Sequence, residues 1–344
     1  MKILVLSDGR AGHDRSSFGI LTALSRRRSV EASVLPIHET RRLSRRLKRA
    51  LAGIMPFEFF WRIFYRVGEH ASDFNPLPVS RRLPDGPVDL VISTGPRTAP
   101  ASIAIARRLR ARNVHYGVSK WPSDVFFTLL LTSERADPHP HRAYAMRPSE
   151  IDAAELPDAR PLAANGAGRR ASLLFGGPLK RNPYTMADME ILAERLAALS
   201  RDMPWLGWTV YDSRRTPKAE FDRLVEVVRS DGAPIEFVRF SDEGLLSNRA
   251  AFASDLVLVT ADSMSMLTES IAARRPTGIL FADAFEPPKR DANEQQALIA
   301  ERRAFRVTFS GLSADAILNG AAGVEALQGS QLDDLCATLA RHGI

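Results

Sequence analysis

The stretch DLVLVTADSMSMLTESIAARRP, residues 255–276, joins an apolar run to a helix-like segment. The run 255–260 is almost entirely aliphatic, which is typical of a strand buried on both faces in a parallel sheet. Asp262 or Ser263 can cap the helix that follows. This order predicts an α/β fold whose helix N-termini lie at the carboxyl ends of the strands, where such folds bind ligands.

Glu269 is the single carboxylate in the predicted helix 263–274. The helical period puts Met264, Leu267 and Ile271 on an apolar face, and it puts Glu269 on a face of small and polar residues. We therefore expect Glu269 to lie outside the core. A solvent-facing glutamate is the alternative to one that contacts a ligand.

Strand-like and helix-like segments alternate through both halves of the chain, as in doubly wound parallel sheets. Strands are expected at 2–7, 31–37, 88–94, 114–119, 125–132, 171–177, 207–213, 235–240, 255–260 and 277–282. Helices are expected at 16–27, 101–112, 185–199, 217–229, 242–253, 263–274 and 330–342. The fold class predicted from this alternation is α/β with parallel sheets.

The chain of 344 residues suits two domains of about 150 residues each. The stretch 148–170 is rich in Pro, Ala, Gly and Asp, as linkers are. We predict a Rossmann-like N-terminal domain over 1–155, with an insertion at 41–70, and a Rossmann-like C-terminal domain over 168–320. Both sheets are expected to face a central cleft. The pattern leaves open the placement of a C-terminal helix within 321–344.

Composition and motifs indicate where in the cell the protein lies and which kinds of site it can contain. The single cysteine, Cys336, excludes an internal disulfide framework and a cysteine-based zinc site. The longest uncharged apolar run, 125–131, is far shorter than the ~20 residues that span a bilayer, and no secretory signal pattern is present. The tract DPHPH at 137–141 has no second ligand cluster, so we expect no metal site. We expect a cytoplasmic protein, soluble or peripheral at the inner face of the cell membrane.

The net charge of +7 comes mostly from the segment 41–70. That segment holds eight Arg or Lys residues against two acids, a balance of +6, and six aromatic residues fall within 57–65. A basic helix followed by an aromatic one indicates a surface for an anionic membrane or another anionic partner. The alternative is a solvated basic helix beside an aromatic core element. No nucleic-acid-binding motif accompanies the charge, so we expect no nucleic-acid partner.

Residues 7–14, SDGRAGHD, are expected to form a glycine-containing turn between the first strand and the first helix. Gly9 and Gly12 let the backbone approach a ligand closely. Histidine side chains in general titrate near neutral pH, so His13 is a candidate general base. The spacing matches neither the G-x-G-x-x-G dinucleotide fingerprint nor a Walker motif, and a purely structural tight turn is the alternative.

Two loops of the second half combine open backbone with positive charge. Gly176–Gly177 follow one predicted strand, with Lys180 downstream. Arg214–Arg215 follow another, just before a helix for which we expect Thr216 as N-cap and Pro217 in the first position. Because Arg binds phosphate through two parallel hydrogen bonds, these loops predict a site for a nucleoside diphosphate.

Five blocks of the chain resemble the mitochondrial-fission "elongate mitochondria" family. They are SDGRAGHD, DLVISTGPRTAPASIAIAR, SLLFGGPLK, YDSRRTP and LVLVTADSMSMLTES, and the likeness covers most of residues 1–310. Bacterial members of this family are regarded as glycosyltransferases of the two-Rossmann (GT-B) type. The resemblance implies a nucleotide-sugar donor held mainly by the C-terminal domain, an acceptor at the N-terminal domain and no obligatory metal.

We therefore predict a metal-independent glycosyltransferase that moves a sugar from a nucleoside-diphosphate sugar to an envelope glycan or a lipid-linked acceptor, with no cofactor. His13 or Asp8 would deprotonate the acceptor hydroxyl, and Glu269 would accept hydrogen bonds from the ribose hydroxyls. The predicted donor site comprises Gly176, Gly177, Lys180, Ser213, Arg214, Arg215, Thr260, Asp262, Ser263, Ser265, Met266 and Glu269. The predicted acceptor side comprises Gly9, Arg10, Gly12, Thr94, Gly95 and Arg97. A non-enzymatic nucleotide-binding membrane adaptor and a sugar-nucleotide 2-epimerase are the alternatives.

Overall fold

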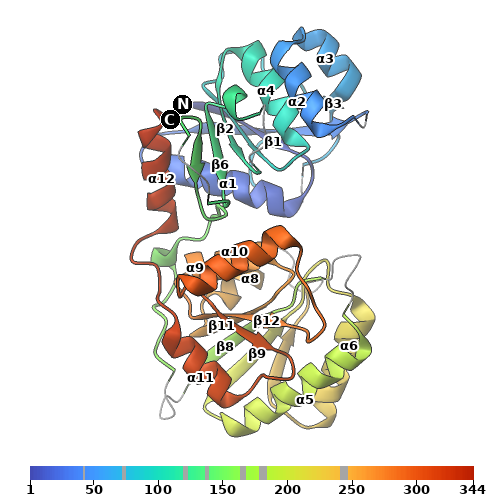
Figure 1. Ribbon diagram of the computed structural model, residues 1–344, viewed down its shortest axis with the longest axis vertical. Coiled ribbons are helices and arrows are strands. Elements are labelled where there is room, and N and C mark those ends of the chain that lie inside the picture. The colour runs from blue at the N-terminus through green and yellow to red at the C-terminus, as the bar shows by residue number, and fades with distance from the viewer. Residues whose placement is uncertain are drawn as a thin grey trace. The chain divides into compact units, whose positions relative to one another are not determined.

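The computed structural model of the protein describes residues 1–41, 43–71, 75–118, 123–135, 139–162, 168–177, 184–240 and 247–344. Two compact units make up the chain (Figure 1). The N-terminal unit comprises 1–150 together with 331–344, and the C-terminal unit comprises 151–330. Each unit is built on its own sheet, and the strand pairs of both sheets are parallel with one exception. The predicted α/β class with two parallel, Rossmann-like sheets is confirmed.

The N-terminal unit has a seven-stranded sheet in the order β3-β2-β1-β4-β5-β6-β7. The strands are β1 (Lys2–Ser7), β2 (Glu31–Glu39), β3 (Tyr65–Val67), β4 (Leu90–Thr94), β5 (Arg112–Tyr116), β6 (Leu129–Thr132) and β7 (Arg142–Tyr144). Only β3, at the edge, runs antiparallel to its neighbour. The chain passes from β1 to β2 on one side and then to β4 on the other, so the strand order reverses between β1 and β4. Doubly wound sheets bind ligands at this switch point.

Helices cover both faces of the N-terminal sheet. They are α1 (Ala11–Ser25), α2 (Arg45–Ile54), α3 (Phe57–Phe64), α4 (Thr98–Leu109) and α12 (Gln331–Arg341). Side chains that alternate along β1 and β4 enter two different clusters, one shared with α1 and α12 and the other with α2, α3 and α4. This alternation explains why the strands read as continuous apolar runs, because both of their faces are buried.

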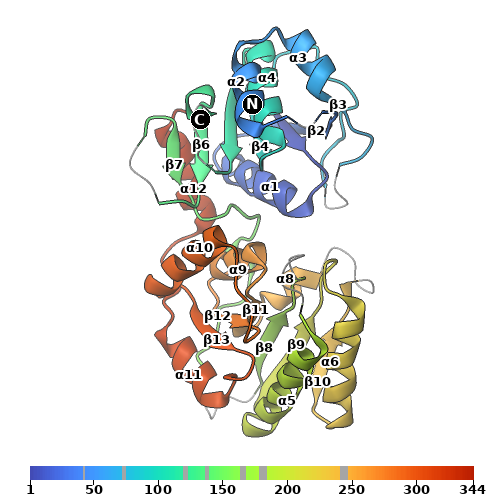
Figure 2. The ribbon, with the colours of Figure 1, turned by 45° about the vertical axis from the view of Figure 1, so that its right-hand side comes forward.

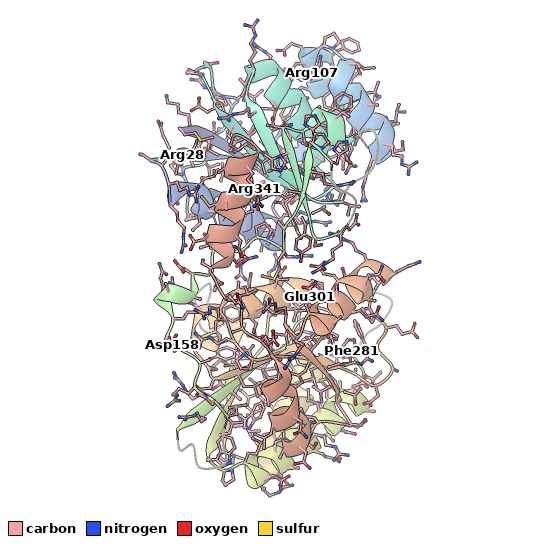
Figure 3. The ribbon with its side chains drawn as sticks, turned by 60° about the vertical axis from the view of Figure 1, so that its left-hand side comes forward. Arg28, Arg107, Asp158, Phe281, Glu301 and Arg341 are labelled. Atoms are coloured by element: carbon pink, nitrogen blue, oxygen red, sulfur yellow. The ribbon has the colours of Figure 1, made fainter. Side chains whose placement is uncertain are left out.

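The C-terminal helix α12 belongs to the N-terminal unit, a placement that its own sequence left open. Leu332, Leu335 and Leu339 recur at helical spacing and join the core cluster around α1. Arg28, labelled in Figure 3, donates a hydrogen bond to the carbonyl of Ile344 at 3.3 Å. The chain therefore returns to its first unit after completing the second.

The C-terminal unit has a six-stranded parallel sheet in the order β10-β9-β8-β11-β12-β13. Its strands are β8 (Arg169–Leu174), β9 (Leu206–Tyr211), β10 (Ile235–Val238), β11 (Leu256–Thr260), β12 (Thr277–Phe281) and β13 (Phe305–Thr308). Its helices are α5 (Met186–Asp202), α6 (Lys218–Ser230), α8 (Ser247–Ala251), α9 (Met264–Ala272), α10 (Lys289–Ala300) and α11 (Ala314–Gly323). Helices α5 and α6 lie side by side (Figure 2). The strand order reverses between β8 and β11, which is the switch point of this unit.

Several helices begin at other residues than the sequence predicted, among them α4, which starts at Thr98 rather than at residue 101. Helix α1 starts at Ala11 rather than at residue 16, because Gly9 turns the chain with a φ of +73° and Arg10 takes an extended conformation as N-cap. Helix α6 starts at Lys218 with Pro217 as N-cap, so the prediction of Thr216 as the cap is wrong. The expected helix 242–253 is observed from Ser247, and residues 241–246 lie outside the described part.

Candidate functional site

The switch point of the N-terminal unit holds the two residues predicted as alternative bases. Asp8 follows β1, and His13 lies in the first turn of α1. The His13 Nδ1 atom is 3.0 Å from one Asp8 carboxylate oxygen and 3.1 Å from the other. The Asp8 side chain is nearly buried, and the Nε atom of Arg10 lies 3.9 Å from it. A proton on Nδ1 that is bonded to Asp8 leaves Nε2 of His13 as the proton acceptor.

Gly95, at the end of β4, supports the His13 ring. A Cβ atom on Gly95 would lie 2.4 Å from Cε1 of His13, so only a glycine leaves room for the imidazole. Gly95 also has a φ of +87°, a conformation that favours glycine. Next to it, the hydroxyls of Thr94 and Ser17 are 2.9 Å apart and join β4 to α1. Thr94 is buried, and its contact is with the protein scaffold.

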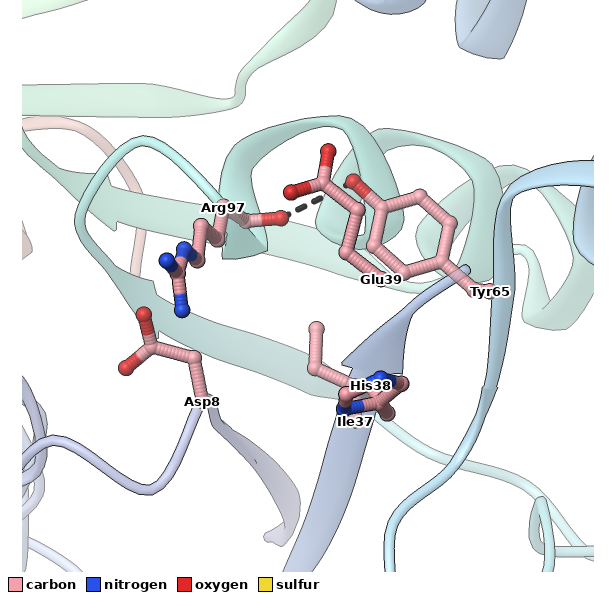
Figure 4. A pocket seen from close by; sticks show the side chains of 6 residues that line it. All are labelled: Asp8, Ile37, His38, Glu39, Tyr65 and Arg97. Carbon is pink, nitrogen blue, oxygen red and sulfur yellow. Dashed lines mark hydrogen bonds between the residues drawn. The ribbon is translucent and has the colours of Figure 1, made fainter. Parts of the chain in front are cut away.

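A pocket of about 190 Å³ adjoins this pair, and its lining residues are Asp8, Ile37, His38, Glu39, Tyr65 and Arg97 (Figure 4). The Tyr65 hydroxyl donates a hydrogen bond to the Arg97 carbonyl at 2.9 Å. Burial raises the pKa of the Tyr65 phenol well above its usual value, so the hydroxyl stays a donor.

The sequence prediction included Asp8 and Arg97 but missed Glu39 and Tyr65. Glu39 ends β2 at the same sheet edge where Asp8 follows β1, so the rule that pointed to Asp8 points to Glu39 as well. Tyr65 carried no such signal. It reaches the pocket only because β3 returns to pair with β2 after the insertion.

The switch point of the C-terminal unit is formed by the loops after β8 and β11. The backbone N–H of Gly176 donates to Thr260 Oγ1 at 2.8 Å, and that of Gly177 donates to Asp262 Oδ2 at 2.8 Å. A Cβ atom on Gly176 would lie 2.3 Å from Asp262 Oδ2, and one on Gly177 would lie 2.2 Å from the Arg215 carbonyl. Both glycines are therefore required by the close packing of three loops.

Asp262 is the buried centre of these loops. Besides Gly177, its carboxylate accepts hydrogen bonds from the Tyr184 hydroxyl at 2.5 Å and from Thr260 Oγ1 at 2.8 Å, and Arg215 lies 3.5 Å away. Burial raises the pKa of the Asp262 carboxyl, and the hydrogen bonds from Tyr184 and Thr260 oppose that shift. Since protein donors surround this carboxylate, the geometry favours a positioning role. Tyr184 was missed by the sequence analysis.

The loop after β9 presents the predicted arginine pair. Arg214 and Arg215 are exposed. Thr216 Oγ1 accepts from the Ser213 backbone N–H at 2.7 Å and donates to the Gly176 carbonyl at 2.6 Å. Thr216 therefore ties the β9 loop to the β8 loop, which explains why it does not cap α6. The fixed loop holds two guanidinium groups at the edge where α/β folds bind phosphates.

Glu269 is buried, with 5% of its surface exposed. The expectation that it lies outside the core is wrong, and the solvent-facing alternative is excluded. The reason is that α9 is enclosed on nearly all sides: Met264, Met266 and Ile271 are buried as well, and only Ser265 is partly open. A helical period shows which residues are apolar but not how many faces of the helix are covered.

Helix α9 begins at the switch point of the C-terminal unit. Ser263 is its N-cap and makes no side-chain capping bond, so its hydroxyl does not satisfy the first backbone N–H groups. These donors are suited to an anion at the helix N-terminus. Lys180, the remaining predicted donor residue, lies outside the described residues.

The described residues contain no group of three or more His, Cys, Asp or Glu side chains placed to hold a metal ion. Over the same ranges, no helix combines the length and the apolar character needed to cross a bilayer.

Comparison with solved structures gives the same overall fold. The chain is similar to Staphylococcus aureus MnaA in a co-structure with UDP, with a TM-score of 0.53, 11% identity and coverage of 99% of this chain and 96% of that one. It is similar to Phytolacca americana UGT2 complexed with UDP-2fluoro-glucose and pterostilbene, with a TM-score of 0.52, 10% identity and full coverage of both chains. It is also similar to Methanocaldococcus jannaschii UDP-GlcNAc 2-epimerase in complex with UDP-GlcNAc and UDP, with a TM-score of 0.50, 10% identity and coverage of 99% and 100%.

At the level of sequence, no curated protein matches the chain. The model of the mitochondrial fission ELM1 family, however, matches residues 11–324. That span includes both sheets apart from β1, and it includes His13, the paired glycines and Glu269. The chain therefore belongs to the mitochondrial fission ELM1 family.

Proposed function

We propose that the protein is a metal-independent glycosyltransferase that moves a sugar from a nucleoside-diphosphate sugar to an envelope glycan or a lipid-linked acceptor. The observation that carries the proposal is the Asp8–His13 pair, a base with its orienting carboxylate 3.0 Å away at a sheet switch point. The second unit adds exposed arginines and a helix N-terminus at its own switch point. One unit is thus suited to activate an acceptor and the other to hold a charged donor.

The donor diphosphate would be bound by Arg214, Arg215 and the first N–H groups of α9, with Lys180 as a further predicted cation. These groups offset the negative charge that develops on the leaving diphosphate. Buried Glu269 would accept hydrogen bonds from the ribose hydroxyls.

In the transfer step, the acceptor oxygen forms a bond to the anomeric carbon while the bond from that carbon to the diphosphate oxygen breaks. His13 Nε2 takes the proton of the acceptor hydroxyl, and Asp8 stabilises the resulting imidazolium. The electron pair of the broken bond leaves with the nucleoside diphosphate. The charge on the product is balanced by the arginines of the donor loops.

We also propose that the protein binds peripherally to an anionic membrane, where a lipid-linked acceptor would be found. The support comes from an apolar face, defined here as Leu43, Leu47, Ile54 and Phe59, all exposed and all from the insertion. Ile54 is 71% exposed and Phe59 is 64% exposed. The insertion that carries them is basic, with a charge balance of +6 over residues 41–70. Apolar side chains among basic ones suit the interface of an anionic bilayer.

Helix α2 exposes apolar side chains of this face, while two of its four charged residues, Lys48 and Arg49, point inward and Arg45 and Arg46 stay exposed. Lys48 and Arg49 are buried, whereas Leu47 is 48% exposed. Lys48 forms an ion pair with Glu39 and lies over the rings of Phe64 and Tyr65. A helix that faces water usually buries its apolar residues and exposes its charged ones.

The aromatic segment of the insertion contains both buried and exposed residues, so its sequence alone did not distinguish a membrane surface from a core element. Phe60 and Phe64 are buried in the core, with their ring centroids 5.1 Å apart and the rings tilted to each other, as the structural alternative expected. Phe59, on the other side of α3, is exposed. Arg107, labelled in Figure 3, donates to the Ala52 carbonyl at 2.8 Å and holds the end of α2 on α4.

The proposal is tested with the full-length protein and a panel of labelled nucleotide sugars, with total envelope lipid and glycan as acceptor. UDP sugars come first, because the similar structures named above contain UDP or a UDP sugar. We expect label to move to the acceptor fraction, with unchanged rate in the presence of EDTA. The absence of transfer with every nucleotide sugar would overturn the proposal.

A sugar-nucleotide 2-epimerase is the second candidate, because one of the similar folds is a UDP-GlcNAc 2-epimerase. It predicts an epimerised sugar or free nucleoside diphosphate without transfer to any acceptor. A non-enzymatic adaptor predicts nucleotide binding without turnover. Analysis of the sugar and nucleotide products in the same reactions separates these three outcomes.

A further inference from the structure

The pocket beside Asp8 contains one cationic side chain that is not paired with a carboxylate of the pocket. Asp8 has His13 at 3.0 Å and Arg10 at 3.9 Å, and Glu39 forms its ion pair with buried Lys48. Both carboxylates of the pocket therefore already have a cationic partner. Arg97 is the cation that remains.

The backbone of Arg97 is fixed by a hydrogen bond, while its side chain is exposed. Its carbonyl accepts the Tyr65 hydroxyl at 2.9 Å. Within the part of the chain that the structure describes, the Arg97 guanidinium has no hydrogen bond or ion pair of its own. Figure 4 shows this guanidinium turned toward Asp8, with which it forms no ion pair. The pocket thus places a free positive charge near the carboxylate that orients the proposed base.

We infer that the acceptor carries an oxyanion, a phosphate or a carboxylate, next to its attacking hydroxyl, and that Arg97 binds that oxyanion in the pocket beside Asp8. This inference rests on the proposed glycosyltransferase function and names the class of its acceptor. A guanidinium binds either oxyanion through two parallel hydrogen bonds, which fixes the orientation of the bound group.

The dimensions of the pocket fit one small polar group. A pocket of about 190 Å³ has room for one ring or one short branch of an acceptor. An oxyanion on Arg97 directs the adjoining hydroxyl toward Asp8, which lines the pocket and lies 3.0 Å from His13 Nδ1. A neutral acceptor lacks this contact and leaves the hydroxyl free to take several orientations.

The experiment measures binding of three probes to the full chain by calorimetric titration: glucose 6-phosphate, glucuronate and glucose. We expect both anionic probes to bind at least tenfold more tightly than glucose. Added salt should weaken the binding of the anionic probes but not the binding of glucose. The ratio of the two anionic affinities distinguishes a phosphate from a carboxylate acceptor. Arg97→Gln should abolish the preference for the anionic probes.

Arg82→Gln is the matched control, because Arg82 is an exposed arginine of the same unit whose partner, Asp85, is equally exposed. Equal binding of glucose and the anionic probes, or an equal effect of the two substitutions, would overturn the inference. Nucleotide titration of Arg97→Gln separates this result from the proposed function, since the donor loops lie in the other unit. Failure of wild-type protein to bind or use any nucleotide sugar would count against the proposed function. A wild-type protein that binds nucleotide sugars but shows no preference for the anionic probes would count only against the inference about Arg97.

Discussion

The imidazole of His13 lies against Gly95, and a Cβ atom at that glycine would come within 2.4 Å of the ring. The two residues belong to different elements, α1 and the end of β4, so their contact joins both sides of the switch point in the N-terminal unit. The position of the proposed base therefore depends on a residue that carries no side chain. This relationship leads to the first prediction.

Gly95→Ala should displace His13 and reduce turnover while leaving nucleotide affinity unchanged. The new methyl group occupies the space of the ring, and a φ of +87° costs alanine about 1–2 kcal/mol of stability. Sugar transfer, thermal unfolding and nucleotide titration measure the three effects. Gly86→Ala is the control, because a Cβ atom there meets nothing within 4 Å. Equal transfer rates in the two variants would disprove the dependence.

Asp8→Asn and His13→Gln should each lower the transfer rate by about 10²–10⁴-fold, as loss of a general base does. The double variant should lose little more than either single one, since the two residues act as one unit. Nucleotide affinity should stay at the wild-type value in all three proteins. Additive losses in the double variant would show that Asp8 and His13 act independently.

Glu269→Gln should weaken nucleoside diphosphate binding tenfold or more if the carboxylate holds the ribose. We choose Gln because Glu269 is buried, and truncation to Ala would leave a cavity that disturbs the fold itself. Calorimetric titration with the nucleotide and with its 2′-deoxy analogue provides the measurement. The variant should be insensitive to the missing hydroxyl, and a retained preference for the ribose form would assign Glu269 a structural role alone.

Membrane binding should depend on the apolar face of the insertion. Wild-type protein is expected to sediment with phosphatidylglycerol vesicles at low salt and far less with phosphatidylcholine vesicles. Ile54→Glu with Phe59→Glu should abolish sedimentation, because both side chains are largely exposed and the charges oppose insertion. Met186→Glu alters an exposed apolar residue of the other unit and serves as control. Equal recovery on both kinds of vesicle would refute the membrane proposal.

His115 should make the stability of the N-terminal unit fall as the pH is lowered. Burial lowers the pKa of His115 to about 3, with nearby Arg49 and His13 acting in the same direction. The unfolded chain then takes up a proton below about pH 6.5 that the folded chain refuses until about pH 3, so stability declines by about 1.4 kcal/mol per pH unit in that window. Above pH 6.5 this residue contributes no pH dependence.

Urea unfolding at several pH values between 4 and 8 tests the His115 prediction. His115→Gln keeps a polar partner for Ser93, whose hydroxyl is 2.8 Å from His115 Nδ1, and it should flatten the acid side of the profile. His70→Gln removes an exposed histidine of the same unit as control. Identical profiles for His115→Gln and the wild type would contradict the assignment.

Local sequence patterns determined most of the strands and helices. The run 255–260 was expected to be a strand buried on both faces, and Leu256–Thr260 is β11 at the centre of its sheet. The patterns predicted residues at the strand ends as site candidates, and Asp8 and His13 do lie together. This succeeds because a strand buried on both faces must be apolar throughout, so its ends are visible in the sequence.

Tertiary structure alone decided how many faces of a helix are covered and which distant segments meet. The sequence placed Glu269 on a polar face, but packing around α9 buries it. Tyr65 lines the pocket because β3 pairs with β2, and α12 completes the N-terminal core although it follows the whole C-terminal unit. Periodicity within one segment records only which residues are apolar. Burial depends on the neighbours that the rest of the chain brings, and no local pattern contains them.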